Sequence, residues 1–396
     1  MLQDLQQIPP DPILGLSAAY AADPNPNKVD LGVGVYKDEQ GRTPIMSAVK
    51  KAEQQWFEAE DTKAYTPQVG VAEFVDGIQT LLLGEGHPAL TEDRARSLQC
   101  PGGSGALQVA ARVLKRARDD VTVWLSDPSW PNHRPLLGTA GVALKDYPYY
   151  DPNTHAVDFG AMTAALNMAE PGSVVLIHGC CHNPSGADLS QEQWRLLAEQ
   201  LNQRQLTPFI DLAYQGLGDG LDEDAFGVRY LSEHCGEVVI ASSASKNFGL
   251  YRERVGGLTF VTASADQSER VRSHGTSVAR GLYSLPPSHG GAIVGTILQS
   301  AELNQEWRQE LNGVRDRING MRAALAVALR ETLGDGRFDF VTQHRGMFSF
   351  LGLSAAQVET LKNDYAIYMV SSSRINVAGL TPTNVIYVAK AVAAVI

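Results

Sequence analysis

Short apolar strands alternate with amphipathic helices through the middle of the chain, and this rhythm restricts the fold more than any other feature of the sequence. Strands are predicted at residues 121–125, 142–147, 174–178, 207–211, 238–242 and 257–263. Helices are predicted at residues 106–117, 131–140, 158–168 and 190–203. Strands this short and this apolar are typical of a parallel sheet with helices on both faces. The sequence therefore predicts an α/β domain.

The character of the sequence changes after residue 300. A long helical stretch at 301–333 precedes strand-like segments within 346–353 and 368–380 and a terminal helix, which together indicate a smaller α+β domain. The first 43 residues are rich in Pro, Asn and Gly and have too little helix or strand to stand alone, so we expect them to pack on this C-terminal part or on a neighbouring chain. The predicted division is an N-terminal arm at 1–12, a small domain at 13–43 and 314–396, and a large domain at 44–313.

The charge of the chain excludes several classes of partner. It has 33 Lys and Arg against 44 Asp and Glu, a net charge of −11, and no dense basic run, so neither nucleic acid nor an anionic membrane surface is expected to bind. No apolar run approaches the roughly 18 residues of a membrane-spanning helix. Charged residues make up 19% of the chain, which is below the usual value of about 25% and indicates some surface that faces a partner subunit.

The N-terminus and the cysteines indicate a cytoplasmic protein. The opening residues MLQDLQQIPPDP lack the basic residues of a secretory signal or a transit peptide. The four cysteines contain no CxxC motif and are too few for a disulfide framework, so a reducing compartment is expected. The adjacent Cys180 and Cys181 are expected to be small buried residues. No metal site is expected.

Polar loops follow the predicted strands at residues 126–133, 179–186, 211–216 and 242–249. An open α/β sheet binds its ligands in the crevice beyond the carboxyl ends of its strands, so these loops are candidate walls of one site. The loop CPGGSGAL at 100–107 runs directly into a helix, and its glycines and Ser104 would form an anion pocket, most naturally for a phosphate. The alternative is a tight turn in which Ser104 caps the helix.

Lys246 follows a strand in SSASKNFG, with Ser243 and Ser245 beside it and Arg254 eight positions later. A lysine at the end of an apolar strand would have a lowered pKa and could act as a nucleophile or a base towards a carbonyl compound. The alternative is an ordinary solvated lysine. Asp211 ends another strand, and a carboxylate removed from water needs a cation, such as the pyridinium nitrogen of a phosphate-bearing cofactor.

Several motifs together resemble the aspartate and aromatic aminotransferase branch of the fold-type I pyridoxal phosphate enzymes. They run from DPILGL and LGVGVYKDEQG near the N-terminus, through CPGGSGAL, SDPSWPNH, CCHNPSG, FIDLAYQG, SSASKNFGLYRERVG and YSLPPSHG, to GMFSF and RINVAGL. The resemblance covers the whole chain. It implies a mostly parallel seven-stranded sheet covered by helices in a large pyridoxal phosphate-binding domain, beside the smaller α+β domain.

The resemblance implies a role for each cofactor-binding residue. Lys246 would bind pyridoxal phosphate covalently and then move a proton between substrate and cofactor. Asp211 would pair with the pyridinium nitrogen, Tyr214 and Asn183 would bond the ring oxygen, and Trp130 would stack on the ring. Trp130 and Asn183 would also contact substrate. The phosphate would be held by Gly103, Ser104, Ser243, Ser245 and Arg254.

Substrate recognition and subunit sharing also follow from the resemblance. Arg374 would bind the α-carboxylate of the substrate through its planar fork, and Gly34 would allow a close approach of the N-terminal segment. Arg280 would come from the neighbouring subunit and bind a side-chain carboxylate, and Tyr65 would reach the phosphate of the neighbour's cofactor. The chain is therefore expected to be a homodimer with shared active sites. The peptide bond Asn183–Pro184 is expected to be cis.

The expected reaction is a ping-pong transamination between an L-amino acid and 2-oxoglutarate, which yields glutamate and a 2-oxo acid. Three positions differ from the aspartate-preferring pattern of Asn, Asn and Thr and make the pocket less polar, namely Leu285, Ala64 and Ser104. Three others match that pattern, namely Val35, Lys37 and Thr43. Ser373 stands where Gly is frequent. We expect an aromatic amino acid aminotransferase that also uses aspartate.

Other functions remain open from sequence alone. A strict aspartate aminotransferase is the first alternative, and a β-lyase or a decarboxylase on the same scaffold is more remote. Carboxylates held by Arg374 and Arg280 would be restrained from leaving, which argues against decarboxylation. The aminotransferase-like effector domain of a transcription regulator would need a basic DNA-binding domain, which the acidic, Pro-rich N-terminus does not provide.

Overall fold

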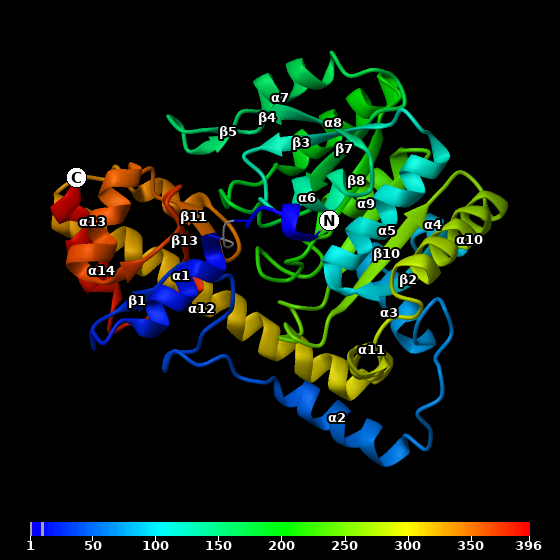
Figure 1. The fold of residues 1–396 in the computed structure, drawn as a ribbon, viewed down its shortest axis with the longest axis horizontal. Coiled ribbons are helices and arrows are strands. Elements are labelled where there is room, and N and C mark those ends of the chain that lie inside the picture. Colours follow the sequence, from blue (N-terminus) through cyan, green and yellow to red (C-terminus); the bar gives the residue numbers. More distant parts are fainter. Residues whose placement is uncertain (1, 9–11) are drawn as a thin grey trace. The chain divides into compact units, whose positions relative to one another are not determined.

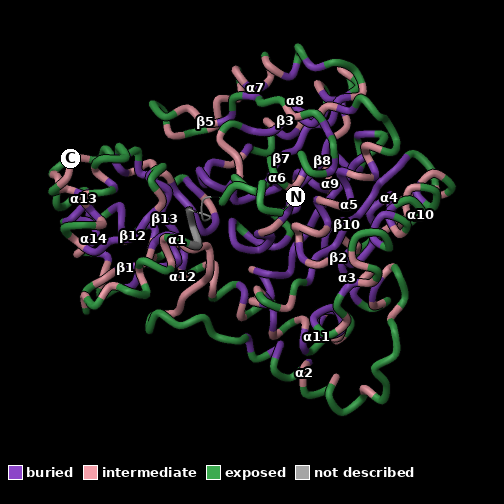
Figure 2. Tube along the Cα trace, viewed as in Figure 1, coloured by how far each residue is buried: buried purple, intermediate pink, exposed green. Residues whose placement is uncertain are grey.

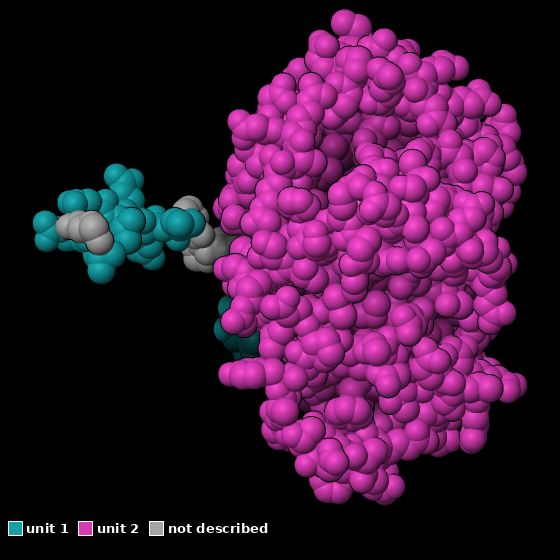
Figure 3. Space-filling view, turned by 90° about the vertical axis from the view of Figure 1, so that its right-hand side faces the viewer, with its two compact units in different colours: residues 1–43, 317–396 teal, residues 44–316 magenta. Residues whose placement is uncertain are grey.

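The computed structural model describes residues 2–8 and 12–396. The chain forms two compact units, one of residues 44–316 and one of residues 1–43 with 317–396 (Figure 3). Helix α12 (Ala301–Leu333) crosses the boundary between them and matches the predicted helix at 301–333. Among the described residues, no helix combines the length and the apolarity that crossing a membrane requires.

The unit of residues 44–316 is built on a seven-stranded sheet (Figure 1). Its strand order is β2-β10-β9-β8-β7-β3-β4. The strands are β2 (Ala95–Pro101), β3 (Thr122–Asp127), β4 (Ala143–Pro148), β7 (Val174–His178), β8 (Thr207–Leu212), β9 (Val238–Ser243) and β10 (Val255–Val261). Strands β4, β3, β7, β8 and β9 pair in parallel, and only β10 pairs antiparallel, with β9 and β2. The expected mostly parallel α/β sheet is confirmed.

Ten helices and a small hairpin accompany this sheet within the described part of the unit. The helices are α2 (Ser47–Ala59), α3 (Ala72–Leu83), α4 (Pro88–Thr91), α5 (Gly102–Ala117), α6 (His133–Gly138), α7 (Phe159–Leu166), α8 (Gln191–Gln203), α9 (Phe226–His234), α10 (Ala265–Leu282) and α11 (Ser288–Gln299). The hairpin pairs β5 (Tyr150–Asp151) with β6 (Ala156–Val157). The central strands β7, β8 and β9 are buried almost throughout, as Figure 2 shows, so both sheet faces are covered. Apolar burial of this kind is the main stabilising contribution to the fold.

Strand β2 is the element of this sheet that the sequence pattern does not predict. Its residues Ser97 and Gln99 are polar but buried, at 2% and 1% exposure. Their side chains are satisfied by distant partners, because Ser97 bonds Thr259 at 2.6 Å and Gln99 donates to the carbonyl of Pro287 at 2.7 Å. A local apolar pattern cannot reveal such a strand.

The other unit combines both ends of the chain. Its described elements besides α12 are η1 (Leu2–Asp4), α1 (Pro12–Ala22), β1 (Val29–Asp30), η2 (Asp339–Gln343), β11 (Phe348–Phe350), α13 (Ala355–Tyr365), β12 (Ile367–Tyr368), β13 (Arg374–Asn376), η3 (Val377–Gly379) and α14 (Val385–Val395). Strand β1 pairs in parallel with β12, and β11 pairs antiparallel with β13. The first 43 residues group with residues 317–396, in line with the expectation that they pack on the C-terminal part. Their longest element is α1, an 11-residue helix rich in alanine, the best helix former, which the sequence pattern does not predict.

Candidate active site

Asp211 lies at the carboxyl end of β8 and is only 6% exposed. The Nε2 of the fully buried His133 lies 2.8 Å from its Oδ2, and because a carboxylate can only accept, Nε2 donates this hydrogen bond. The Nδ1 of His133 lies 2.8 Å from the hydroxyl of Ser129, which orients the ring. Burial alone would raise the pKa of Asp211, but the hydrogen bond from His133 and the nearby cations hold it below its ordinary value. The carboxylate is therefore kept as an anion in the interior.

Lys246 stands three residues beyond β9, next to the end of the strand that carries Asp211. Its side chain is only partly accessible to water, and this burial lowers its pKa to about 8. The charge of Asp211 opposes this shift, whereas that of Arg254 adds to it. The Nζ lies 4.9 Å from the ring centre of the buried Tyr214. With this pKa, roughly a tenth of the lysine is a neutral, nucleophilic amine at pH 7.

The amino end of α5 packs closely against Ser243 at the end of β9 and Arg254 in the loop that follows β9. Gly102 has φ +68°, and a Cβ on it would lie 2.4 Å from an Nη atom of Arg254. A Cβ on Gly103 would lie 3.3 Å from the Cβ of Ser243. The hydroxyl of Ser243 donates to that of Ser245 at 3.0 Å. Backbone N–H groups at a helix amino end, two hydroxyls and a guanidinium together are the chemistry that binds a phosphate.

Trp130 and Asn183 lie in the loops that follow β3 and β7. Trp130 is half-buried, and its ring meets that of His133 edge-on with 5.3 Å between centroids. Asn183 is 6% exposed, and the Asn183–Pro184 bond is cis, as expected. The carboxyl ends of neighbouring parallel strands therefore carry Trp130, Asn183, Asp211 and, just beyond β9, Lys246.

The other unit contains the predicted carboxylate-binding arginine. Arg374 is 3% exposed, donates to the carbonyl of Gly32 at 2.8 Å and lies over the ring of Phe348 at 4.3 Å. Gly34 lies against the same ring, because a Cβ on it would meet the Cζ of Phe348 at 2.7 Å. Ser373, where Gly is frequent, has φ +67°, a strain on the order of 1 kcal/mol. Its hydroxyl accepts from the N–H of Leu353 at 2.9 Å, which fixes the backbone beside Arg374.

Comparison with known proteins agrees with this geometry. Residues 26–392 match the family model described as aminotransferase class I and II. The chain belongs to the class I and II aminotransferases. It is 46% identical to the aspartate aminotransferase of Salmonella typhi over the full length of both chains. It is also 46% identical to the aromatic-amino-acid aminotransferase of Pseudomonas aeruginosa, over 98% of this chain and 97% of the relative.

A solved structure extends the likeness of this aminotransferase to the cofactor. The aromatic-amino-acid aminotransferase from Burkholderia pseudomallei, covalently bound to pyridoxal phosphate, superposes with a TM-score of 0.98 at 45% identity. The match covers 100% of this chain and 99% of the other. This aminotransferase is a pyridoxal phosphate-dependent enzyme of transamination.

The residues described above fit that cofactor. The absence of a side chain at Gly102 lets the guanidinium of Arg254 approach the amino end of α5, and positive charge beside the N–H groups of a helix start suits the dianionic phosphate. The lowered pKa of Lys246 suits covalent bonding to a carbonyl carbon. The anionic, buried Asp211 suits a protonated ring nitrogen. Each of these three features is present in the protein without the cofactor. Burying such charged groups with no bound cofactor to pair with them costs folding free energy.

The aminotransferase also contains site residues that sequence reasoning missed. His133 ends the motif SDPSWPNH, but its contact with Asp211 joins residues 78 positions apart, so no local spacing predicts it. His178 packs against His133 with 5.2 Å between ring centroids, and its own ring lies 4.4 Å from that of His182. Burial lowers the pKa of His178 to about 3, so this histidine stays neutral. The one available signal was the position of His178 and His182 around a strand end.

Two predicted site residues within residues 44–316 lie at the exposed surface rather than in this cluster. Tyr65 is 95% exposed. Arg280, in the last turn of α10, is exposed and donates to the hydroxyl of Ser284.

Proposed function

We propose that this enzyme transfers the amino group of an aromatic amino acid or of aspartate to 2-oxoglutarate by a ping-pong mechanism, with aromatic substrates preferred. The observation that carries the proposal is Arg374, a buried guanidinium of the kind that binds a carboxylate through two parallel hydrogen bonds. Every proposed substrate and product has an α-carboxylate. Relatives named for aspartate and for aromatic amino acids are equally similar to this chain, so overall identity favours neither.

The preference for aromatic substrates is supported by three side chains that are less polar or smaller than those of the aspartate-preferring pattern. Leu285 and Ala64 offer no hydrogen-bonding group, and Ser104 offers a smaller side chain than threonine. The ammonium of Lys37 is bound by Asp30 at 2.8 Å and lies 5.7 Å from the ring centre of Tyr20, so it has partners within its own unit. A less polar, roomier pocket favours a ring over a second carboxylate by a few kcal/mol at most.

The proposed roles of the residues follow from their chemistry. Pyridoxal phosphate, when bound, supplies an electron-accepting ring that makes the α-carbon of the substrate acidic. Lys246 would bind the cofactor and, once released by substrate, its neutral Nζ would take the proton from the α-carbon and later return it. Asp211 would keep a positive charge on the ring nitrogen, with His133 holding the carboxylate in place. Tyr214, Asn183 and Trp130 would orient the ring.

The remaining cofactor contact is the phosphate, which we propose is held by Gly103, Ser104, Ser243, Ser245 and Arg254. On this assignment residues 44–316 form the cofactor-binding domain, and residues 1–43 with 317–396, which include Gly34 and Arg374, form the small domain. We also propose that the enzyme works in the cytoplasm. In support, none of its four cysteines forms a disulfide, although Cys180 and Cys181 are adjacent.

We propose that the enzyme is a homodimer in which Tyr65 and Arg280 serve the neighbour's site. Ile45, Phe57 and Tyr65 expose their apolar surfaces at 48%, 78% and 95%, which is typical of an interface rather than of a solvated surface. Sedimentation should give the mass of two chains, and activity per chain should fall once the protein is diluted below the dissociation constant of the dimer. A monomer that keeps full activity would contradict the shared site.

Substrate preference is tested by comparing kcat/KM for phenylalanine and for aspartate, with 2-oxoglutarate as acceptor. We expect the aspartate value to lie within about tenfold of the phenylalanine value or below it. Replacing Leu285→Asn should move the ratio towards aspartate by about tenfold, because it returns an amide to the pocket, whereas Leu282→Asn should not. A wild-type ratio of aspartate over phenylalanine above about 100 would establish a strict aspartate aminotransferase instead.

A further inference from the structure

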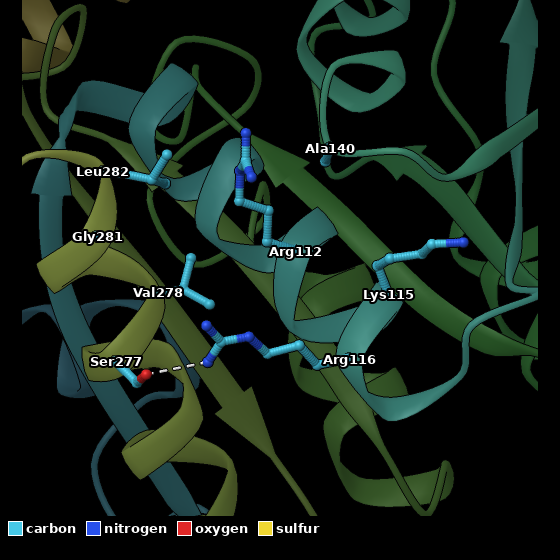
Figure 4. Close-up of a pocket in the computed structure, with 8 residues that line it drawn as sticks. All are labelled: Arg112, Lys115, Arg116, Ala140, Ser277, Val278, Gly281 and Leu282. Atoms are coloured by element: carbon cyan, nitrogen blue, oxygen red, sulfur yellow. Dashed lines mark hydrogen bonds between the residues drawn. The ribbon is translucent and has the colours of Figure 1, made fainter.

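A second basic pocket lies between α5 and α10, away from the amino end of α5. It has a volume of about 280 Å³ and is lined on the α5 side by Arg112, Lys115 and Arg116. The α10 side contributes Ser277, Val278 and Leu282. Figure 4 shows Arg112 and Arg116 projecting from successive turns of α5 on the side of α10, and Lys115 extending away from α10. No acidic residue is among the eight that line the pocket.

The two arginines are bonded only to neutral groups within the part of the chain that the structure describes. Arg112 donates to the side-chain oxygen of Gln108 at 3.0 Å, and Arg116 donates to the hydroxyl of Ser277 at 3.1 Å. Lys115 differs, because it has a carboxylate partner in Asp119, 3.1 Å from its Nζ. The charge of the two arginines is available to a ligand.

The carboxyl ends of two helices reduce the positive charge of this pocket. The pocket lies near the carboxyl ends of α5 and α10, each of which carries a partial charge of about −0.5. Those two contributions together cancel about one of the two guanidinium charges. A net charge of about +1 remains, and it acts through directed N–H donors rather than through charge alone.

We propose that this pocket binds the phosphate group of a small molecule. Guanidinium forks match the tetrahedral oxygens of a phosphate, and the Ser277 hydroxyl adds a neutral donor or acceptor. Val278, Leu282 and Ala140 are the apolar side chains among the lining residues, and they would contact the carbon atoms of a phosphate ester. A volume of about 280 Å³ suits a phosphate or a small phosphomonoester. A bound anion would join α5, whose amino end forms the proposed cofactor cradle, to the last turns of α10.

Calorimetric titration of the holoenzyme with inorganic phosphate, at constant ionic strength, tests the proposal. Saturation with cofactor fills the proposed cradle, so added phosphate reports on other sites. The test variant is the double replacement Arg112→Gln with Arg116→Gln. The control is Arg195→Gln with Arg270→Gln, which removes two positive charges from exposed ion pairs elsewhere in the same unit. Glycerol phosphate serves as the phosphomonoester probe.

We expect the wild type and the control to bind phosphate with a dissociation constant on the order of 1 mM, and the double variant to bind at least about tenfold more weakly. Glycerol phosphate binding as tightly as inorganic phosphate identifies phosphomonoesters as the ligand class, and binding tenfold weaker identifies free phosphate. Equal affinities of the wild type and the Arg112, Arg116 variant overturn the proposal. Absence of saturable binding by the wild type up to about 50 mM overturns it too.

Discussion

Replacing Lys246→Ala should lower kcat/KM for transamination by at least about 10⁴-fold, the largest effect expected of any single substitution in this enzyme. The change removes the amine that we assign both to covalent cofactor binding and to proton transfer at the α-carbon of the substrate. No other described lysine combines closeness to Asp211 with a pKa lowered to about 8. The measurement is the rate of 2-oxoglutarate-dependent amino transfer from aspartate and from phenylalanine.

Two further readouts separate loss of chemistry from loss of folding. Lys145→Ala removes a surface lysine of β4 that lies over Trp124 at 5.4 Å, and it should leave activity within about twofold of wild type. In wild-type apoenzyme, covalent capture of pyridoxal phosphate should speed up as the pH rises towards about 8 and then level off, because only the neutral amine reacts. A Lys246→Ala protein that retains the absorbance of covalently bound cofactor would contradict the assignment.

The elements that were predictable from the sequence are those in which local pattern and tertiary environment agree. Helix α12 repeats apolar residues at helical spacing over its full length, and strand β8 is a short apolar run, so both were predicted within a residue or two. Strand β2 was missed because Ser97 and Gln99 are buried through side-chain bonds to remote residues. The sequence does not predict helix α1, because the Pro, Asn and Gly residues around its alanines are typical of a loop.

The candidate site shows the same division. Lys246 follows a predicted strand, Asp211 ends one, and the glycines in the first turn of α5 precede a predicted helix. The rule that ligands bind beyond the carboxyl ends of parallel strands therefore brings them to one edge of the sheet. His133 could not be assigned a function in this way, because its role depends on a contact with Asp211 across 78 residues. The left-handed conformation of Ser373 was equally invisible, since it is imposed by the turn between β12 and β13 and stabilised by Leu353.

Replacing Asp211→Asn should lower kcat/KM by about 10³-fold while leaving the fold intact, the second largest effect that we expect. Asparagine keeps the size of the side chain and can still meet His133, but it carries no charge. The wild-type site keeps this carboxylate ionised despite burial, through the hydrogen bond from His133 and nearby positive charge. A buried carboxylate that stays ionised can stabilise a positive group beside it. We assign the protonated ring nitrogen of the cofactor as that group, and it loses its charged partner in the variant. The steady-state rate of transamination measures the loss.

Two companion variants distinguish the charge of Asp211 from its shape as the cause of the lost activity. Asp211→Glu restores the anion with one extra methylene and should recover part of the lost rate, whereas a purely spatial role predicts that glutamate in this buried position is worse than asparagine. His133→Asn removes the ring that holds Asp211 but not the charge, so it should cost only about tenfold and should move the acidic limb of the pH profile upward. The sign follows because the hydrogen bond from His133 is what lowers the pKa of Asp211, and without it the carboxylate takes up its proton at a higher pH. An Asp211→Asn enzyme with wild-type activity would show that the buried charge stabilises the protein without serving catalysis.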